Sequence, residues 1–319
     1  MKKILCVLMS CLLFVMAGCS GHSKNLKFGA ADIGGVYYSF ASTFTQLADK
    51  EIDGYTFETK TTAGSVANLR LISDGYIDLA IAQADLLSDA YNATGTFADK
   101  KYQKGYKAVA SLYTECCQIV VRKDSGITGI DDLINKTVSV GASESGTEKN
   151  AEQILKMSGI TDELINKVNM DYTEAAEKLK AGEIDAFFCT AGTRTEVIGQ
   201  LSKECDIRLI SLDDKCIDKM LSAYSLCEKY TIPAGTYNGQ DSDVTTIGVK
   251  AVLIAKQSLS DDVIKNVTKT IYEHADDFKY ATSLDISFDI NTAADGVDIP
   301  FHSGAAAYYT ERGINVLTE

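Results

Sequence analysis

The sequence predicts an α/β protein made of two similar lobes, and three observations lead to this prediction. From residue 26 onward, apolar strands alternate with amphipathic helices, the pattern of parallel sheets covered by helices. A helix end, a glycine turn and a strand occur twice, as LISDGYIDLA at 71–80 and LKAGEIDAF at 179–187. Two long apolar strands, 108–122 and 246–255, stand where the chain would cross from one half to the other and back.

The predicted elements follow from these patterns in chain order. In the first half we expect strands at 26–30, 55–61 and 77–82 and helices at 38–50 and 66–73, the second helix ending at Gly75. In the second half we expect strands at 137–141, 167–170 and 184–189 and helices at 147–157 and 174–181. Helices at 261–280 and 304–312 return to the first half. Lobe 1 is therefore predicted to comprise 26–120 and 247–319, and lobe 2 to comprise 121–246.

The N-terminus reads as an export signal. Lys2 and Lys3 precede an apolar stretch at 4–16, which ends in the small residues Ala17 and Gly18 followed by Cys19. This order is typical of lipoproteins, so residues 1–18 are predicted to be removed, Cys19 to be lipidated and 19–25 to form a polar tether. The alternative is an ordinary cleaved signal in which Cys19 stands by chance.

Charge and composition narrow the possible partners. Loss of Lys2 and Lys3 with the signal changes the formal net charge from −13 to −15. An acidic surface argues against nucleic acid and against adsorption on anionic lipids, so membrane attachment depends on the lipid of Cys19. Since Pro233 and Pro300 are the only prolines, the connections between the lobes are expected to be strands.

Six cysteines remain after the signal and Cys19, and they show no C-x-x-C spacing of a zinc or redox site. We expect them to be mostly reduced and structural. If they are oxidised, the last three are the most prone to pair. The six are Cys116, Cys117, Cys189, Cys205, Cys216 and Cys227.

Three loops place glycine and hydroxyl residues directly before a helix, where unpaired N–H groups favour a carboxylate or phosphate. A fourth loop, at 191–193, has the same small residues. Alternatively, Ser65 and Thr147 are simple helix caps, as either would be in isolation. The repetition at matching strand ends favours a shared cleft, and the predicted ligand-binding residues of these loops are Gly35, Tyr37, Tyr38, Gly64, Ser65, Asn68, Ser145, Gly146, Thr147, Ala191 and Gly192.

Two further groups are assigned to the same cleft. Gln83 and Asp85 follow a buried strand and would accept hydrogen bonds from an ammonium group, unless they are simply polar residues at an exposed strand end. Tyr37, Tyr38 and Tyr113 would form an apolar wall with hydroxyl groups, unless they are core tyrosines. The predicted ligand is therefore small and anionic or zwitterionic.

Catalysis finds little support in the sequence. His22, His274 and His302 have no neighbouring nucleophile, and the chain contains no Walker A loop, H-E-x-x-H motif or EF-hand loop. We therefore predict no catalytic residues, no metal site and no cofactor. A binding protein, expected as a monomer, fits better than an enzyme.

Five blocks resemble the TAXI subfamily of solute-binding proteins, which serve TRAP (tripartite ATP-independent periplasmic) transporters. They are GGVYY at 34–38, TAGSVANLRL at 62–71, VSVG at 138–141 with SGT at 145–147, IDAFF at 184–188 and IPAGTYNGQD at 232–241. The resemblance implies a type II periplasmic-binding-protein fold with a ligand cleft between two lobes, and an ion-driven permease as membrane partner. It also implies a small carboxylate ligand such as glutamate or glutamine, held outside the cytoplasmic membrane.

Two departures bear on the ligand. Val36 stands where the family often has Thr, which removes a hydroxyl near the site, and no arginine equivalent to the carboxylate-binding arginine of other TRAP receptors is evident. The alternatives are a sensor lipoprotein of the same fold without a transport role, and an enzyme resembling porphobilinogen deaminase. The export signal counts against the enzyme, which would usually be cytoplasmic.

Overall fold

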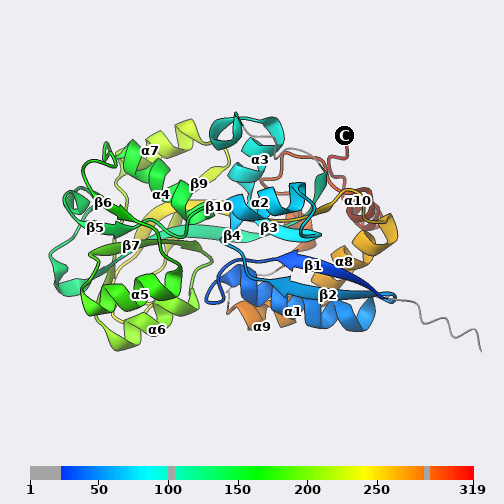
Figure 1. Ribbon diagram of the computed structural model, residues 1–319, viewed down its shortest axis with the longest axis horizontal. Coiled ribbons are helices and arrows are strands. Elements are labelled where there is room, and N and C mark those ends of the chain that lie inside the picture. Colours follow the sequence, from blue (N-terminus) through cyan, green and yellow to red (C-terminus); the bar gives the residue numbers. More distant parts are fainter. Residues whose placement is uncertain (1–22, 100–104, 284–287) are drawn as a thin grey trace, which may run out of the picture.

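The computed structural model describes residues 23–99, 105–283 and 288–319. The predicted signal 1–18 and Cys19 lie outside these residues. The described strands form one ten-stranded mixed sheet in the order β2-β1-β3-β10-β4-β7-β5-β6, with β8 beside β4 and β9 beside β10. Helices lie on both sides of it (Figure 1).

The first lobe is built on three parallel strands, in which β1 (Lys24–Gly29) lies between β2 (Tyr55–Lys60) and β3 (Leu79–Gln83). All five side chains of β3 are buried, as expected for a central parallel strand. The helices of this lobe are α1 (Val36–Glu51), α2 (Ser65–Ser73), α3 (Ala84–Asn92), α8 (Asp261–Glu273), α9 (Ala275–Thr282) and α10 (Ser303–Thr310).

The second lobe repeats this plan, with β5 (Thr137–Ser139) between β6 (Asn166–Val168) and β7 (Ala186–Ala191), all parallel. Two short outer strands complete it, β8 (Ile207–Leu209) and β9 (Cys227–Ile232). Its helices are α4 (Gly146–Met157), α5 (Tyr172–Ala181), α6 (Glu196–Glu204) and α7 (Asp214–Ala223). Short 3-10 turns lie at Gly95–Phe97, Lys123–Ser125, Ile130–Leu133 and Ile290–Thr292.

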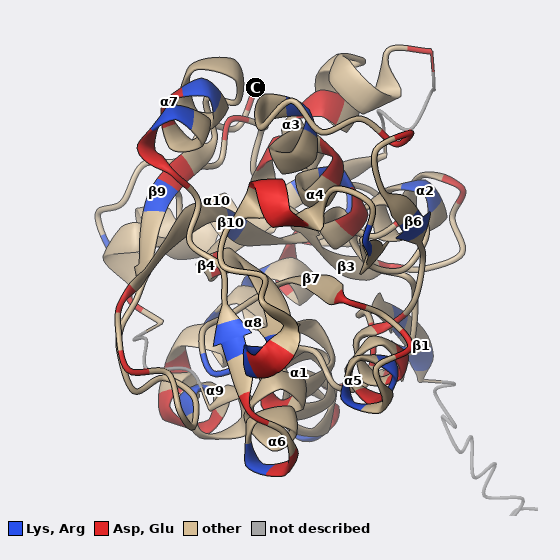
Figure 2. Cartoon of the chain, turned by 90° about the vertical axis from the view of Figure 1, so that its left-hand side faces the viewer, with Lys and Arg blue, Asp and Glu red and all other residues tan. Residues whose placement is uncertain are grey.

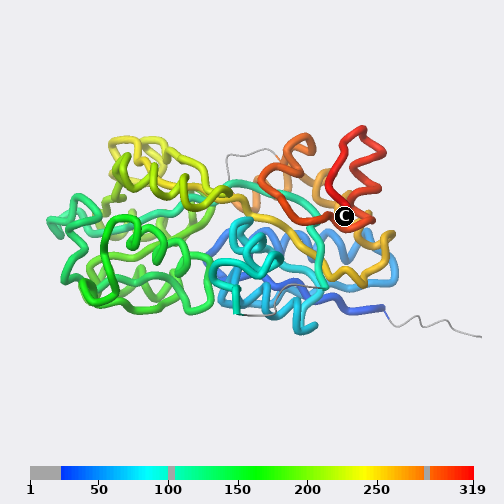
Figure 3. Tube along the Cα trace, turned by 90° about the horizontal axis from the view of Figure 1, so that it is seen from above, coloured from blue at the N-terminus to red at the C-terminus, as the bar shows by residue number. Residues whose placement is uncertain are grey.

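Two long antiparallel strands, β4 (Tyr106–Arg122) and β10 (Val244–Lys256), run through both lobes. From Ala251 onward β10 pairs with β3 of the first lobe, whereas up to Val249 it pairs with β9 of the second. Likewise β4 pairs with β7 only from Cys116 onward. Figure 3 shows the resulting two-part shape, with the C-terminal segments lying beside the N-terminal ones. The predicted α/β fold of two lobes joined by crossover strands is confirmed, while the lobe limits stay a prediction.

Two details of the predicted elements are wrong. The strand predicted at 26–30 begins at Lys24, so the end of the predicted tether 19–25 belongs to the sheet. The single helix predicted at 261–280 is broken at His274, whose backbone (φ −114°, ψ 28°) leaves the helical region. The His274 ring bonds Glu51 at 2.6 Å and Asp277 at 2.8 Å, which ties the break to α1.

Aromatic packing joins the end of the chain to its beginning. Phe40 of α1 stacks on Phe278 of α9 with ring centroids 4.5 Å apart, and both side chains are fully buried. Such a pair adds about 0.5 to 1.5 kcal/mol to the burial of its surface. Helix α9, near the end of the chain, therefore packs on α1, near its beginning.

The outer helices carry charged residues (Figure 2), whereas most of the cysteines are buried. Acidic and basic residues are mixed on the outer helices α5, α6 and α7 (Figure 2). The six cysteines of the described part are free, and all but Cys205 are buried. Their reduced state stays a prediction. No helix of the described residues is sufficiently long and apolar for a membrane span.

Candidate functional site

A small cavity lies between the lobes at the strand ends, with a volume of about 30 Å³. This is room for about two water molecules. The first lobe contributes residues from the loops before α1 and α2, and the second contributes the loop before α4 and parts of α5 and β7. The lining residues are Ala31, Asp32, Gly35, Val36, Tyr37, Ala63, Gly64, Ser65, Gln83, Glu115, Ala142, Ser145, Gly146, Thr147, Tyr172, Thr190 and Ala191.

Three helix N-termini converge on this cavity, those of α1, α2 and α4. Gly35 caps α1 and Gly64 caps α2, neither offering a side-chain oxygen to the helix. Gly64 has φ 116°, a conformation that favours glycine. The first N–H groups of these helices and their positive dipole ends suit an anion.

Ser65 and Thr147 do not cap their helices, which excludes the alternative reading of these two residues. Ser65 Oγ accepts from the Gln83 backbone N–H at 3.1 Å. Thr147 Oγ1 accepts from the Thr190 N–H at 3.1 Å and lies 2.6 Å from the Tyr172 hydroxyl. Only Ser145 is a true N-cap, accepting from the Glu148 N–H at 2.9 Å. The hydroxyls thus fasten the loops to neighbouring strands.

Glu115 of β4 is the acidic group at the base of the cavity. Its side chain is buried and its carboxylate accepts a hydrogen bond from the Tyr37 hydroxyl at 2.7 Å. Burial raises the pKa of Glu115 to about 8, and hydrogen bonds from Tyr37 and Gln83 oppose the shift only in part. The carboxyl group is therefore mostly neutral at pH 7.

Asp32 adds a second acid to the lining. Partial burial, together with the nearby charge of Asp171, raises its pKa to about 6, so it is mostly ionised at pH 7. The cavity lining that the structure describes contains no Lys, Arg or His. Nor does the described part of the chain hold a group of three or more His, Cys, Asp or Glu placed to bind a metal ion.

The structure brings most of the predicted ligand-binding residues together around the cavity. Those in its lining are Gly35, Tyr37, Gly64, Ser65, Gln83, Ser145, Gly146, Thr147 and Ala191. Those outside the lining are Tyr38, Asn68, Asp85, Tyr113 and Gly192.

Asn68 is a structural residue of the first lobe. Its side chain is fully buried, and Nδ2 donates to the carbonyl oxygens of Ala30 at 2.6 Å and Ile81 at 2.9 Å. Its Oδ1 accepts from Thr62 Oγ1 at 2.7 Å. Asn68 therefore joins strands and loop behind the cavity, and its predicted ligand contact is wrong in this arrangement.

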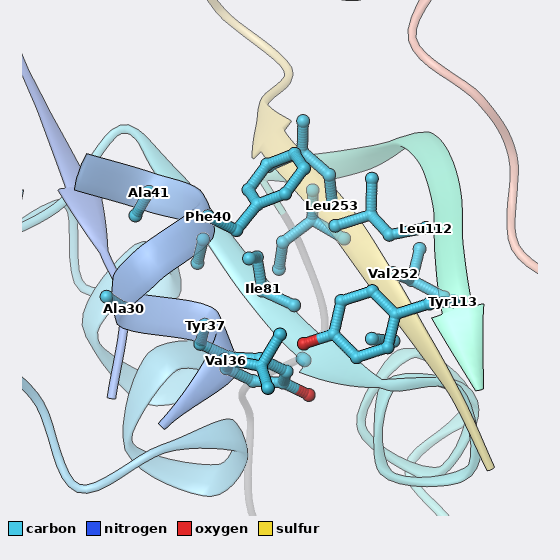
Figure 4. Packing of buried hydrophobic residues seen from close by; sticks show 14 of the residues in the cluster. Ala30, Val36, Tyr37, Phe40, Ala41, Ile81, Leu112, Tyr113, Val252 and Leu253 are labelled. Carbon is cyan, nitrogen blue, oxygen red and sulfur yellow. The ribbon is translucent and has the colours of Figure 1, made fainter. Parts of the chain in front are cut away.

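Asp85 and Tyr113 lie behind the cavity instead of in its wall. The Asp85 carboxylate is buried in the first turn of α3, and this burial raises its pKa to about 6, while weak contacts with the Leu86 N–H and the Gln153 side chain oppose the shift in part. Tyr113 packs in the apolar cluster beside Val36 and Tyr37 (Figure 4), so it is a core tyrosine. Tyr38 also packs against this cluster. The cavity lining contains Glu115 instead of the predicted Asp85.

Sequence reasoning missed the lining residues Glu115, Tyr172 and Thr190 and left Asp32 without a role. Glu115 does carry a signal, because it is the one acid inside the apolar run of β4. A charged residue is rarely buried in a strand without a reason. Tyr172 and Thr190 carry no such signal, since their place depends on how the second lobe folds.

The two lobes contact each other directly around the cavity. The Ala67 N–H donates to the Glu144 carbonyl at 3.0 Å, and Arg70 pairs with the Glu144 carboxylate at 2.6 Å. Gln83 Nε2 donates to Asn150 Oδ1 at 3.0 Å. These bonds join α2 and β3 of the first lobe to the α4 region of the second, so the cleft is closed and entry of a ligand requires the lobes to separate.

Comparison with known proteins supports this description. Residues 28–313 match the sequence profile described as the NMT1-like family. PhnD1 from Prochlorococcus marinus, solved with methylphosphonate, is 12% identical with a TM-score of 0.58, over 83% of this chain and 93% of that one. The periplasmic binding protein BugD is 11% identical with a TM-score of 0.55, over 81% of this chain and 85% of that one. The fold is therefore that of periplasmic binding proteins.

Proposed function

The chain belongs to the NMT1-like family, and from this premise we propose that it is an extracytoplasmic solute-binding lipoprotein. Its role is to capture a small carboxylate or amino acid, similar to glutamate or glutamine, by closing its lobes. The proposal also includes delivery of the ligand to a TRAP permease, on the strength of the five sequence blocks that resemble TAXI receptors. It assigns no catalytic role to the chain.

The observation that carries the proposal is the convergence of helix N-termini from both lobes on one cavity. α1 and α2 belong to the first lobe and α4 to the second, so an anion between them contacts both lobes at once. A ligand that touches both lobes favours the closed state by the contacts that the open state lacks. These N–H groups take the place of the carboxylate-binding arginine that the sequence lacks.

The size of the cavity defines how capture works. Because about 30 Å³ holds about two waters, an amino acid requires the lobes to stand somewhat further apart than here. The bonds of Arg70 and Gln83 across the cleft are then the contacts that adjust. Binding of methylphosphonate by the related fold of PhnD1 supports a small anionic ligand for this chain.

The proposed location follows from the N-terminal segment. Cleavage before Cys19 and lipidation of that residue would hold the protein at the outer face of the cytoplasmic membrane or in the periplasm. A Cys19→Ala variant should appear in the soluble fraction instead of the membrane fraction. Retention of this variant in the membrane fraction would contradict the anchor.

Native mass spectrometry and a thermal-shift screen test ligand capture. Protein purified without refolding is expected to carry a small acid, and stripped protein is expected to melt at a higher temperature with amino acids or small carboxylates. Ser65→Ala with Thr147→Ala should abolish this shift, while Ser222→Ala, exposed on α7, should retain it. Absence of a co-purified acid together with no thermal shift across the screen would refute the proposal.

A further inference from the structure

We infer that Glu115 selects, among small carboxylates, those that carry a protonated amine, and that capture of the amine releases a proton from Glu115. This inference rests on the proposed function and adds the ligand class. It assigns the amine contact to a residue of the crossover strand β4 and not to the loops before α1, α2 and α4.

The position of Glu115 provides the first argument. Its carboxyl group lines the cavity together with Tyr37, whose hydroxyl donates to Oε2 at 2.7 Å. Burial and the neighbouring Glu115 charge raise the pKa of Tyr37 well above its ordinary value, so this hydroxyl stays protonated and remains a donor. Gln83 also interacts with this carboxylate, but its two oxygens together accept up to about four hydrogen bonds, so Tyr37 and Gln83 leave capacity for a ligand donor.

The charges around Glu115 provide the second argument. Asp32 shares the lining and Asp85 lies behind it, and both are acids. The other titratable neighbours are tyrosines and cysteines, and burial raises their pKa values well above 7, so they are neutral at pH 7. They are Tyr37, Tyr113, Tyr172, Cys116 and Cys189. Because no basic side chain lines the described cavity, its acidic part lacks a positive charge that an ammonium group would supply.

The helix N-termini provide the complementary half of the site. A carboxylate is stabilised at the N–H groups of α1, α2 and α4, whereas Asp32, and Glu115 in its ionised form, repel it. A ligand with one carboxylate and one ammonium group satisfies both parts of the same cavity. A dicarboxylate is stabilised by the helix N-termini but supplies no positive charge to the acidic part of the cavity.

Proton release follows from the state of Glu115 before capture. Burial keeps this carboxyl group mostly protonated at pH 7, and an ammonium group beside it favours the ionised form. On capture the O–H bond of the carboxyl breaks and its proton passes to solvent, with no other bond changed. Between pH 6 and pH 8 the affinity for an amine ligand should therefore rise by up to about tenfold per pH unit, and level off above pH 8.

A protonated Glu115 that donates to a second ligand carboxylate is the competing arrangement. It predicts the opposite pH dependence, because affinity would fall as Glu115 loses its proton. It also predicts no preference for an amine, so the same measurement separates the two.

Isothermal titration calorimetry with L-glutamate, glutarate and 2-oxoglutarate tests the inference on the intact mature protein. Titrations at pH 6, 7 and 8, in phosphate and in Tris, give the affinity and the number of protons released. We expect L-glutamate to bind at least tenfold more tightly than the other two at pH 7.5, with nearly one proton released at pH 7. Glu115→Gln should lose both the preference and the proton release, and Glu58→Gln, on the exposed side of β2, should retain both.

The outcomes separate this inference from the proposed function. If wild-type protein binds glutarate or 2-oxoglutarate as tightly as L-glutamate, or if Glu115→Gln keeps the preference, the inference is wrong and capture of a carboxylate stands. If none of the three probes binds, both are wrong. Tyr37→Phe serves as a second variant in case Glu115→Gln does not fold. It removes a bond that favours the ionised carboxylate, so it should move the rise in affinity to higher pH, and an unchanged midpoint would overturn the inference.

Discussion

Gly146, the first residue of α4, lies so close to the Gln83 side chain that a methyl group on its Cα would collide with the Gln83 amide. Gln83 cannot easily move away, because it is buried and bonded to Asn150 across the cleft. Gly146→Ala should therefore hinder closure and weaken ligand affinity by tenfold or more, measured by calorimetry. The stability of the fold should be nearly unchanged, since alanine suits a helix better than glycine.

The matched control for this change is Gly199→Ala. Gly199 lies inside α6, where a methyl group would meet no atom within 4 Å. This variant should bind like the wild type and gain up to about 1 kcal/mol of stability. If Gly146→Ala binds ligand as tightly as the wild type, Gly146 and Gln83 lie further apart in the ligand-bound protein than in the arrangement described above.

The ion pair between Arg70 and Glu144 should contribute modestly to holding the lobes together. Both side chains are partly exposed, and such pairs contribute about 0.2 to 1 kcal/mol. Arg70→Gln should therefore increase the ligand dissociation rate about two- to fivefold in stopped-flow measurements, with less effect in high salt. Lys60→Gln breaks a surface pair with Glu58 inside one lobe and should leave the rate unchanged.

The stability of the ligand-free protein should depend on pH through Glu115. The pKa of this carboxyl is about 8 in the folded protein, against an ordinary value of 4.5 in an unfolded chain, so the folded state holds its proton more tightly. As pH rises from 4.5 to 8 the wild type loses up to about 5 kcal/mol of unfolding free energy from this group alone, and nothing further above pH 8. Glu115→Gln lacks this loss.

Urea titrations of both proteins at pH 5, 6.5 and 8 measure this difference. The stability of Glu115→Gln relative to wild type should increase with pH. If the difference in unfolding free energy between the two proteins is the same at all three pH values, the Glu115 carboxyl is solvated in the ligand-free protein.

Asn68→Ala separates folding from binding. The change removes a donor to two buried carbonyl groups and should lower the unfolding free energy by about 2 to 4 kcal/mol. Ligand affinity of the folded variant should remain within about twofold of wild type. A large loss of affinity with unchanged stability would instead restore the ligand contact that the sequence predicted for Asn68.

Thiol reactivity tests the buried cysteines. Burial raises the pKa of Cys116 and of Cys117 to about 12, which leaves almost no thiolate at pH 8. Of the six described cysteines, only Cys205 is partly exposed, and it alone should react quickly with Ellman's reagent. All six should react in denaturant, and rapid labelling of a second native thiol would contradict the closed packing.

The sequence predicted those site residues whose position is determined by the neighbouring residues in the chain. A loop such as 62–65 brings its glycine and serine to a helix N-terminus whatever the rest of the chain does. The alternation of strands and helices likewise predicts the lobes, because each element must bury its apolar side. Loop residues Gly35, Ser65 and Thr147 were accordingly placed at the cavity.

The parts that sequence did not predict depend on long-range packing. Asn68 and Asp85 have the same polar character as true lining residues, and only the packing of neighbouring strands turns them away from the cavity. Glu115 reaches the cavity because β4 crosses between the lobes at that point. The break at His274 depends on the partner Glu51, 223 residues earlier in the chain.

Because Glu115 belongs to a strand that runs through both lobes, its carboxyl group stays near the pivot when the lobes separate. The N-termini of α1, α2 and α4, in contrast, each belong to a single lobe and would move with it. If the proposed function holds, unloading would then have a fixed sequence of events, in which the ligand loses its anion contacts early and its amine contact last. A recipient that attracts the carboxylate would meet it already released, with the ligand still tethered at its other end.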